Sequence, residues 1–161
     1  MSYNWSKDIS EMHHKFGVKD WFEANKDNKD LMDKYLRFRL SMCKEELDET
    51  LDAIEAKDAE EIVDGLIDMC VFAIGTLDVF GVDATAAWQK VYNANMEKSV
   101  GVKEGRPNPF GLPDLMKPDG WVAPSHEGNH GQLELALGMV EKSLWERISK
   151  YFFHIFYRST K

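Results

Sequence analysis

Apolar residues recur at helical spacing along most of the chain. Between residues 30 and 56, one apolar stripe recurs every three or four positions, which is typical of a single helix face. The members of this stripe are Leu36, Leu40, Cys43, Leu47, Leu51 and Ile54. The same periodicity predicts helices over about residues 6–16, 58–81 and 132–157, and another that begins at Asp83. Residues 62–80 are apolar on nearly all sides, which predicts a buried central helix.

Turn-forming residues separate these predicted helices. Asp58 is a good N-cap residue, and Gly17 and Gly81 suit the position just after a helix. All five prolines lie between Pro107 and Pro124, which predicts a long irregular loop. No strand or internal repeat is expected. We therefore predict an all-α fold, an antiparallel helical bundle of four to five helices with a long Pro/Gly-rich loop before the last helix.

Composition narrows the class of protein. The chain has 161 residues, of which 43% are apolar and 30% charged, as expected for one soluble domain. Its net charge of −8 makes it a poor non-specific ligand for nucleic acid, so no nucleic-acid partner is expected. The polar N-terminus has no signal peptide, and the longest nearly apolar run, residues 69–77, is too short to span a bilayer. Two cysteines in helical apolar patterns suggest buried free thiols in the cytoplasm.

Acidic residues cluster on two successive predicted helices. Glu45, Glu46 and Glu49 fall within an arc of about 100° on the first helix. Glu61, Asp64 and Asp68 fall within about 60° on the second. A short link near Lys57 makes the two helices antiparallel neighbours, so that the two clusters can face each other.

Asp64 and Asp68 carry the most information because their neighbours in the chain are apolar. We expect both to be buried, and a buried carboxylate is costly unless it is paired with a cation. No lysine or arginine lies between Ala59 and Gln89, so Mg²⁺, or Mn²⁺ as a substitute, is the simplest partner. Alternatively, Glu61 only completes a capping box with Asp58. Neither helix has the histidines that a di-iron bundle requires.

The order of these acids resembles a known family signature. Glu45-Glu46-x-x-Glu49 followed by Glu61-x-x-Asp64 is similar to the motif of the MazG-like, all-α nucleotide pyrophosphohydrolases, which include dimeric dUTPases and phosphoribosyl-ATP pyrophosphohydrolases. Seven further segments resemble motifs of phage and bacterial members and occur in the same order. They are residues 8–13, 16–17, 37–40, 75–76, 80–83, 95–99 and 117–121. The resemblance predicts a pyrophosphohydrolase domain over residues 1–124, then a linker and an amphipathic C-terminal helix over 125–161. The expected location is the cytoplasm, or the host cytoplasm if the protein is encoded by a phage.

The resemblance also implies a reaction and roles for particular residues. Family members cleave nucleoside triphosphates, (d)NTPs, between the α- and β-phosphates and release pyrophosphate. Carried over by position, Glu46, Glu49, Glu61 and Asp64 bind Mg²⁺, Asp68 is a further ligand, and Glu45 orients or deprotonates the attacking water. The residues expected to bind substrate are Asn95, Lys98, Arg106 and Lys117 at the phosphates, and His13 and Phe16 at the base. For these residues, ordinary surface charge or core packing are the alternative roles.

Other functions remain open from the sequence. The substrate is either a (d)NTP or another nucleotide such as phosphoribosyl-ATP, and the assembly is expected to be a homodimer or homotetramer. From a different class, a non-catalytic helical assembly module would use the acids for a structural divalent ion. Residues 126–130 match the His-Glu-x-x-His pattern of zinc proteases, but nearby Pro124, Gly128 and Gly131 argue against the helix that this pattern needs.

The C-terminal residues differ in charge from the rest of the chain. Residues 141–161 carry five basic and two acidic residues, a local charge of +3. Their apolar positions continue the helical stripe, so we expect a helix that docks on its own core or on a neighbouring subunit. Association with a membrane surface is the less favoured alternative.

Overall fold

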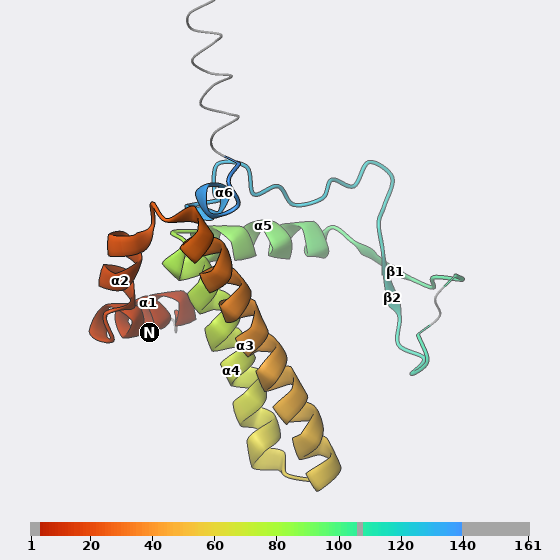
Figure 1. Ribbon diagram of the computed structural model, residues 1–161. Coiled ribbons are helices and arrows are strands. Elements are labelled where there is room, and N and C mark those ends of the chain that lie inside the picture. The colour runs from red at the N-terminus through yellow and green to blue at the C-terminus, as the bar shows by residue number, and fades with distance from the viewer. Residues whose placement is uncertain (1–3, 106–107, 140–161) are drawn as a thin grey trace, which may run out of the picture. The chain divides into compact units, whose positions relative to one another are not determined.

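The computed structural model describes residues 4–105 and 108–139, and it is predominantly helical (Figure 1). In these residues the elements are α1 (Trp5–Lys15), α2 (Val18–Asn25), α3 (Lys29–Ala56), α4 (Ala59–Val79), α5 (Ala84–Met96), β1 (Ser99–Gly101), β2 (Asp114–Met116) and α6 (Leu133–Ala136). The predicted all-α fold is confirmed. Helix α2 and the two short strands were not predicted. The chain forms two compact units, Met1–Val82 with His130–Lys161 and Asp83–Asn129, and each is described by itself.

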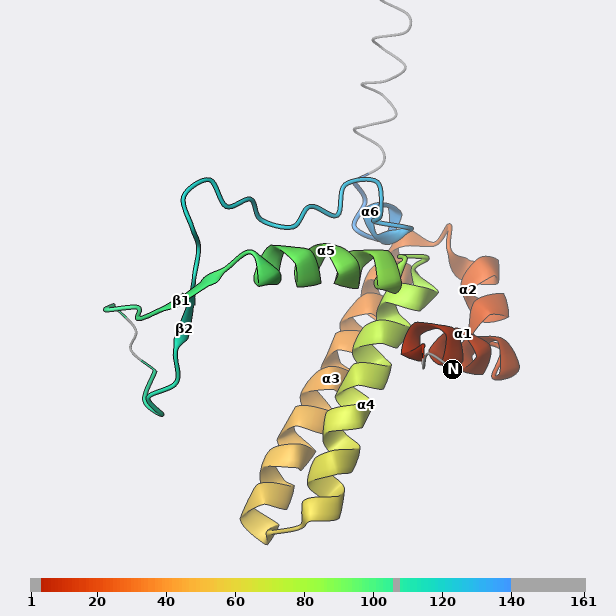
Figure 2. The same ribbon diagram turned by 180° about the vertical axis from the view of Figure 1, so that it is seen from behind.

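Helices α3 and α4 form a long antiparallel hairpin, seen side by side in both views (Figures 1 and 2). Helix α3 ends at Lys57, which adopts a left-handed conformation with φ of 59°. Helix α4 starts at its predicted N-cap, where the Asp58 carboxylate accepts from the amides of Glu60 and Glu61. The predicted short link near Lys57 is therefore confirmed, and it brings the two acidic segments onto neighbouring helices.

The core of the first unit lies where α2, α3, α4 and α6 meet. It consists of Phe22, Met32, Val79, Phe80 and Ala136. Phe22 and Phe80 meet edge to face, with ring centroids 5.4 Å apart. Helix α1 packs against α4 and α2 near the same end of the hairpin. The hairpin is thus anchored at one end, and Figures 1 and 2 show its other end, where α3 turns into α4, extending beyond α1 and α2.

The prediction that residues 62–80 form a buried central helix is wrong for the first half of α4. Val63 is 61% exposed, Leu66 49% and Ile67 43%. The four buried residues of α4 are Gly65, Gly75, Thr76 and Val79. The reason is that α1 and α2 support one end of the hairpin, and among the helices described for this unit only α3 lies beside the other end of α4. A sequence that is apolar on all sides of a helix predicts that the helix can be buried. It does not predict whether the same chain or another molecule buries it.

The predicted helix over residues 132–157 is interrupted early. Helix α6 ends at Ala136, and Gly138 adopts a left-handed conformation with φ of 68°. The amide of Met139 donates to the Glu134 carbonyl and that of Gly138 to the Leu135 carbonyl, which is the hydrogen-bond pattern of a Schellman C-cap. The remainder of that predicted helix, from residue 140, lies outside the described residues.

The second unit contains α5 and a two-stranded antiparallel ribbon. The Asp83 side chain caps α5 by accepting from the amide of Ala86. Strands β1 and β2 pair with Ser99 opposite Met116 and Gly101 opposite Asp114. Around Gly128, whose φ is 76°, the chain forms a turn in which the Asn129 amide donates to the His126 carbonyl. The expectation that the His-Glu-x-x-His segment is not helical is therefore confirmed.

In the part of the chain that the structure describes, no single helix is long and apolar enough to cross a membrane. Helices α4 and α5 reach that length and composition only when they are counted together.

Candidate functional site

A glycine brings α3 and α4 together in the middle of the acidic segments. A Cβ atom added at Gly65 would lie 2.3 Å from Thr50 Oγ1 and 3.3 Å from the Glu46 carbonyl oxygen. The Thr50 hydroxyl is itself buried and donates to that carbonyl at 2.7 Å. The two helices therefore touch at the turn of α3 that begins with Glu46, and Asp64 is the immediate neighbour of the contact residue on α4.

The electrostatics of Glu46 show that the acids of the two helices act on one another. Burial of Glu46 and repulsion from neighbouring carboxylates raise the pKa of its side chain. Those neighbours are Asp68, Glu49, Glu45 and Asp64, in decreasing order of effect. The structure thus brings together five of the six acids that the sequence singles out. They form what we call the acidic face: Glu45, Glu46, Glu49, Asp64 and Asp68.

The predicted burial of Asp64 and Asp68 is wrong. Asp64 is exposed and Asp68 is half-buried, for the same reason that leaves the first half of α4 uncovered. Mutual repulsion, rather than burial of Asp64 and Asp68, is therefore the physical argument for a cation at this face. Carboxylate oxygens are the donors that Mg²⁺ prefers, so the residues present suit that ion.

Glu61 stands one turn before Asp64 and is exposed. Of the capping box with Asp58, one half is present, because the Glu61 amide donates to the Asp58 carboxylate at 3.3 Å. The Asp58 amide donates to the Ala53 carbonyl at 2.9 Å and not to the Glu61 side chain. Within residues 4–105 and 108–139, no three histidine, cysteine or acidic side chains converge closely enough to hold a metal ion. The acidic face is therefore a group of carboxylates that repel one another. The predicted set of Mg²⁺ ligands stays a prediction.

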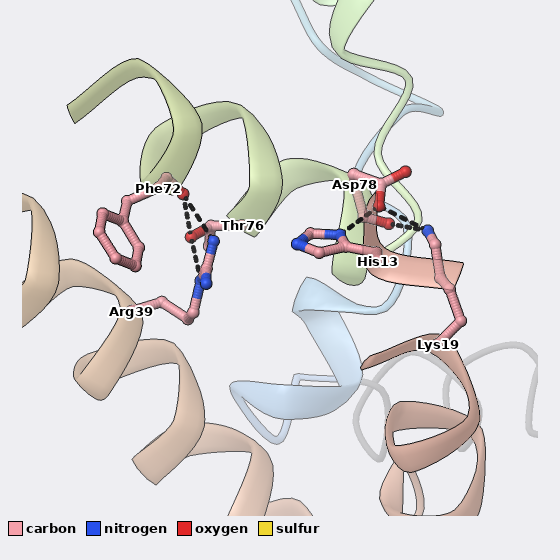
Figure 3. A network of polar contacts seen from close by, with 6 residues as sticks. All are labelled: His13, Lys19, Arg39, Phe72, Thr76 and Asp78. Atoms are coloured by element: carbon pink, nitrogen blue, oxygen red, sulfur yellow. Dashed lines mark hydrogen bonds and ion pairs between the residues drawn. The ribbon is translucent and has the colours of Figure 1, made fainter. Parts of the chain in front are cut away.

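His13 belongs to a buried polar network near the other end of α4 (Figure 3). Its side chain is 10% exposed, and its Nδ1 lies 2.6 Å from Oδ2 of Asp78, which also accepts from Lys19 Nζ at 2.7 Å. Burial, together with the positive charges of Arg39 and Lys19, lowers the pKa of His13 although the Asp78 carboxylate acts to raise it. Burial acts to raise the pKa of Asp78, but hydrogen bonds from Lys19, His13 and Ser10 and the positive charge of Lys19 together lower it. The ring is therefore neutral, with Nδ1–H donating to Asp78.

Arg39 extends this network from α3. Its Nε donates to Thr76 Oγ1 at 3.2 Å, and its Nη2 donates to the Phe72 carbonyl at 3.2 Å (Figure 3). A Cβ atom added at Gly75 would lie 2.6 Å from Arg39 Nη2 and 3.2 Å from His13 Nε2, so this glycine is what lets the two side chains approach α4. Sequence reasoning missed Arg39, Lys19 and Asp78. The available signal was an acid at position 78 in an apolar helix, without a basic residue nearby on that helix.

The other residue expected at the base is Phe16. It follows α1, is 66% exposed, and has the Lys15 ammonium 5.2 Å from its ring centroid. Within the first unit, the structure therefore offers an exposed ring at Phe16 and a buried, hydrogen-bonded ring at His13.

The residues expected at the phosphates lie in the second unit. Lys98 lies beyond the end of α5, and its Nζ donates to Oδ1 of Asn95, in the last turn of that helix, at 2.7 Å. Lys98 and Lys117 both lie over the ring of Trp121, at 5.3 Å and 4.6 Å from its centroid. Arg106 lies outside the described residues.

Comparison with known proteins assigns the chain to a family. A family model described as phosphoribosyl-ATP pyrophosphohydrolase matches residues 11–95, which is more than half of the chain. The matched segment contains α3, α4 and the whole acidic face. No curated protein matches the chain. The chain therefore belongs to the phosphoribosyl-ATP pyrophosphohydrolase family, within the MazG-like superfamily, and is a nucleotide pyrophosphohydrolase.

Proposed function

We propose that the protein hydrolyses (d)NTPs to (d)NMPs and pyrophosphate, with Mg²⁺ as cofactor. The observation that carries the proposal is the acidic face, where burial and then repulsion from four carboxylates on two helices raise the pKa of Glu46. Such repulsion destabilises the protein unless a bound cation offsets it, and cleavage of a phosphoanhydride needs that same cation to neutralise the phosphates. An acidic protein of net charge −8 also needs a cation at its site before it can hold a polyanion.

Each acid has a proposed role. Glu46, Glu49, Glu61 and Asp64 hold the ion, Asp68 supports them from the next turn of α4, and Glu45 orients or deprotonates the attacking water. When bound, Mg²⁺ supplies Lewis-acid stabilisation of charge on the phosphate oxygens. Because Glu46 is already partly covered, its carboxylate loses less hydration on binding a cation than an exposed one. Asn95, Lys98, Arg106 and Lys117 are proposed to bind phosphates, and His13 and Phe16 the nucleoside.

A second substrate class deserves a direct test. The matching family model is described as phosphoribosyl-ATP pyrophosphohydrolase, and this favours phosphoribosyl-ATP as the alternative to a (d)NTP. Both substrates are cleaved at the same α–β phosphoanhydride, so the acidic face serves either reaction. The distinction lies in the nucleoside part, on the side that His13 and Phe16 are proposed to contact.

We also propose that copies of the chain associate through the hairpin, as a homodimer or homotetramer. Exposed apolar residues lie on one stripe of α3 and on the first half of α4. They are Leu40, Leu47, Leu51, Ile54, Val63, Leu66 and Ile67. Exposed apolar residues gathered on one segment of a protein favour an interaction site there. Replacing Leu51 and Leu66 with lysine should lower the mass measured by light scattering, and an unchanged mass would refute the assigned face.

The catalytic proposal is tested by pyrophosphate release. Wild-type protein is incubated with a panel of NTPs, dNTPs and phosphoribosyl-ATP, with Mg²⁺ and with EDTA. Glu49→Gln should lose at least about 100-fold in rate, by analogy with the removal of one preorganised electrostatic group from an active site. Asp52→Asn is the matched control, because this exposed acid lies on the same helix three residues further on.

The outcomes separate the alternatives. Metal-dependent release that Glu49→Gln abolishes and Asp52→Asn preserves supports the proposal, and the panel names the substrate. Release that Glu49→Gln leaves intact means that the site is elsewhere. If the wild type releases nothing from any nucleotide but melts at a higher temperature with Mg²⁺, the acids bind a structural ion and the hydrolysis proposal fails.

A further inference from the structure

Side chains from two other helices converge on Gly75 in α4. A Cβ atom at this glycine would lie 2.6 Å from Nη2 of Arg39 on α3 and 3.2 Å from Nε2 of His13 on α1. The two nitrogens are therefore no further apart than the sum of these two distances. Figure 3 shows this nitrogen of the His13 ring on the side that faces Arg39. One small planar group can thus contact both side chains.

His13 offers a hydrogen-bond acceptor at this point. Its Nδ1–H is committed to Asp78, 2.6 Å away, so Nε2 of the neutral ring carries a lone pair and no proton. Among residues 4–105 and 108–139, the one buried side-chain nitrogen or oxygen without a hydrogen-bond partner is Nδ1 of His126. Nε2 of His13 also has no partner in this part of the chain, so it reaches the surface. It is open to a ligand that donates a hydrogen bond.

Arg39 offers hydrogen-bond donors beside that acceptor. A guanidinium has five N–H groups, and Arg39 uses two of them, on Thr76 Oγ1 and on the Phe72 carbonyl. In the residues that the structure describes, Arg39 forms no ion pair with a carboxylate, although the chain has 28 acidic residues. A half-buried guanidinium with unused donors favours a ligand that presents an oxygen acceptor.

This pair of side chains is in register with the acidic face. Arg39 precedes Glu46 by seven residues on α3, and Gly75 follows Asp68 by seven residues on α4. Seven residues make nearly two helical turns, so each pair shares a stripe and is about 10 Å apart along its helix. Because α3 and α4 are antiparallel, both steps run in the same direction along the hairpin. A nucleotide whose phosphates meet the acidic face can therefore extend its base to Arg39 and His13.

We propose that Arg39 and His13 select nucleotides whose base has a lactam edge, in which a ring N–H stands beside a carbonyl group. The ring N–H donates to His13 Nε2, and the carbonyl oxygen accepts from Arg39. A carbonyl oxygen has two lone pairs and a ring nitrogen has one, so the carbonyl satisfies more of the unused donors. Uracil, thymine and guanine have a lactam edge, whereas adenine has no carbonyl group. The inference rests on the proposed function, which brings the nucleoside to His13.

Asp78 and Lys19 are positioning residues for this selection. The Asp78 carboxylate keeps the proton of His13 on Nδ1, and Lys19 binds the same carboxylate at 2.7 Å. In Asp78→Asn the amide can turn its NH₂ group toward Nδ1, which moves the proton to Nε2. The acceptor then becomes a donor and faces the donor of the lactam. We expect this variant to lose selectivity for the base while the phosphates still bind.

The test is calorimetric titration of the full chain in Mg²⁺ with the α,β-imido analogues of dUTP, dGTP and dATP. The wild type should bind the first two at least about tenfold more tightly than the dATP analogue. Arg39→Lys keeps the charge but loses the planar fork of donors, so it should abolish this preference. Arg37→Lys is the matched control, because this exposed arginine on the same helix pairs with Asp33 and should bind as the wild type does.

Two further measurements test the role of His13 and Asp78. Methylation of the ring nitrogen removes the N–H, so the N3-methyl form of the dUTP analogue should bind the wild type at least about tenfold more weakly than its parent. The difference should shrink in Asp78→Asn. Nitrogen NMR of the free protein should find the His13 proton on Nδ1 in the wild type and on Nε2 in Asp78→Asn. This last result does not depend on catalysis.

The inference is overturned if the wild type binds the three analogues equally or not at all, if Arg39→Lys keeps the preference, or if His13 carries its proton on Nε2 in the wild type. Failure of the proposed hydrolysis is a separate result. A protein that releases no pyrophosphate, yet prefers lactam bases through Arg39, keeps this inference and loses only that function. A protein that hydrolyses every base at one rate, with or without Arg39→Lys, keeps the function and loses the inference.

Discussion

Replacing Gly65 with alanine tests whether the close contact of α3 and α4 is as tight as the geometry indicates. Helix propensity alone favours alanine over glycine inside a helix by about 1 kcal/mol. At Gly65, however, the new Cβ would lie 2.3 Å from Thr50 Oγ1 and 3.3 Å from the Glu46 carbonyl oxygen. Because Thr50 is short and buried, it cannot swing away as the end of a long side chain can.

The two effects oppose each other, and their sizes decide the sign. Overpacking a buried contact costs about 1–3 kcal/mol. Set against the gain of about 1 kcal/mol from propensity, Gly65→Ala should destabilise the protein by up to about 2 kcal/mol. Removing the hydroxyl by Thr50→Ala leaves no atom closer than the Glu46 carbonyl oxygen at 3.3 Å. In that background Gly65→Ala should therefore stabilise the protein.

The assay is urea unfolding followed by circular dichroism, for the wild type, both single variants and the double variant. The expected result is a change of sign, with Gly65→Ala lowering the free energy of unfolding in the wild type and raising it in Thr50→Ala. The four values form a double-mutant cycle whose interaction energy should be about 1–3 kcal/mol. If Gly65→Ala has the same effect in both backgrounds, the helices are not in contact at Thr50 and the geometry of the acidic face must be revised.

Three further predictions follow from the contacts described above. The pKa of His13 is lowered in the folded protein, so its contribution to stability is present above the unfolded value of about 6.5 and is lost as pH falls. The melting temperature of His13→Gln should therefore fall less between pH 7 and pH 5 than that of the wild type. The control His14→Gln should behave as the wild type does. Equal slopes for all three proteins would contradict the lowered pKa of His13. Because the folded-state pKa of Glu46 is raised, stability is lost as pH rises through it, so Glu46→Gln should raise the melting temperature at neutral pH in EDTA while removing hydrolysis. Gly131→Ala should destabilise the protein by about 2 kcal/mol in urea unfolding, because its Cβ would lie 2.1 Å from the Phe80 carbonyl oxygen at φ of 53°; an unchanged midpoint would mean that this contact yields easily.

Local signals explain which parts of the fold could be predicted. The apolar stripe and the Asp58 cap were sufficient for α3, α4 and their link, since periodicity and capping depend on neighbouring residues. The end of α6 could have been predicted as well, because Gly138 is a good C′ residue inside the apolar pattern. The ribbon could not, because three-residue strands carry too little periodicity and their pairing joins residues far apart in the chain.

The candidate site was predictable in its residues but not in its environment. Spacing along two antiparallel helices was enough to bring five acids together. The exposure of Asp64 and the partial exposure of Asp68 were not predictable, because the sequence of an apolar helix is the same whether its own chain or another molecule covers it. His13 was singled out, but its partner Asp78 lies 65 residues away, and only tertiary structure brings such a pair together.

The acidic face and the exposed apolar stripe lie on the same part of the molecule, and each makes that part less stable alone. The hairpin is anchored at one end by the core around Phe22 and Phe80, whereas its acidic segments have mainly each other as neighbours. Repulsion at Glu46 and uncovered Val63 both oppose the isolated hairpin. A cation at about 100 times its dissociation constant would add about 2.7 kcal/mol, and a second molecule over the apolar stripe would add burial of its own. Binding therefore stabilises the structure where the chain alone supports it least, so the proposed cofactor and the proposed assembly should strengthen each other even without touching.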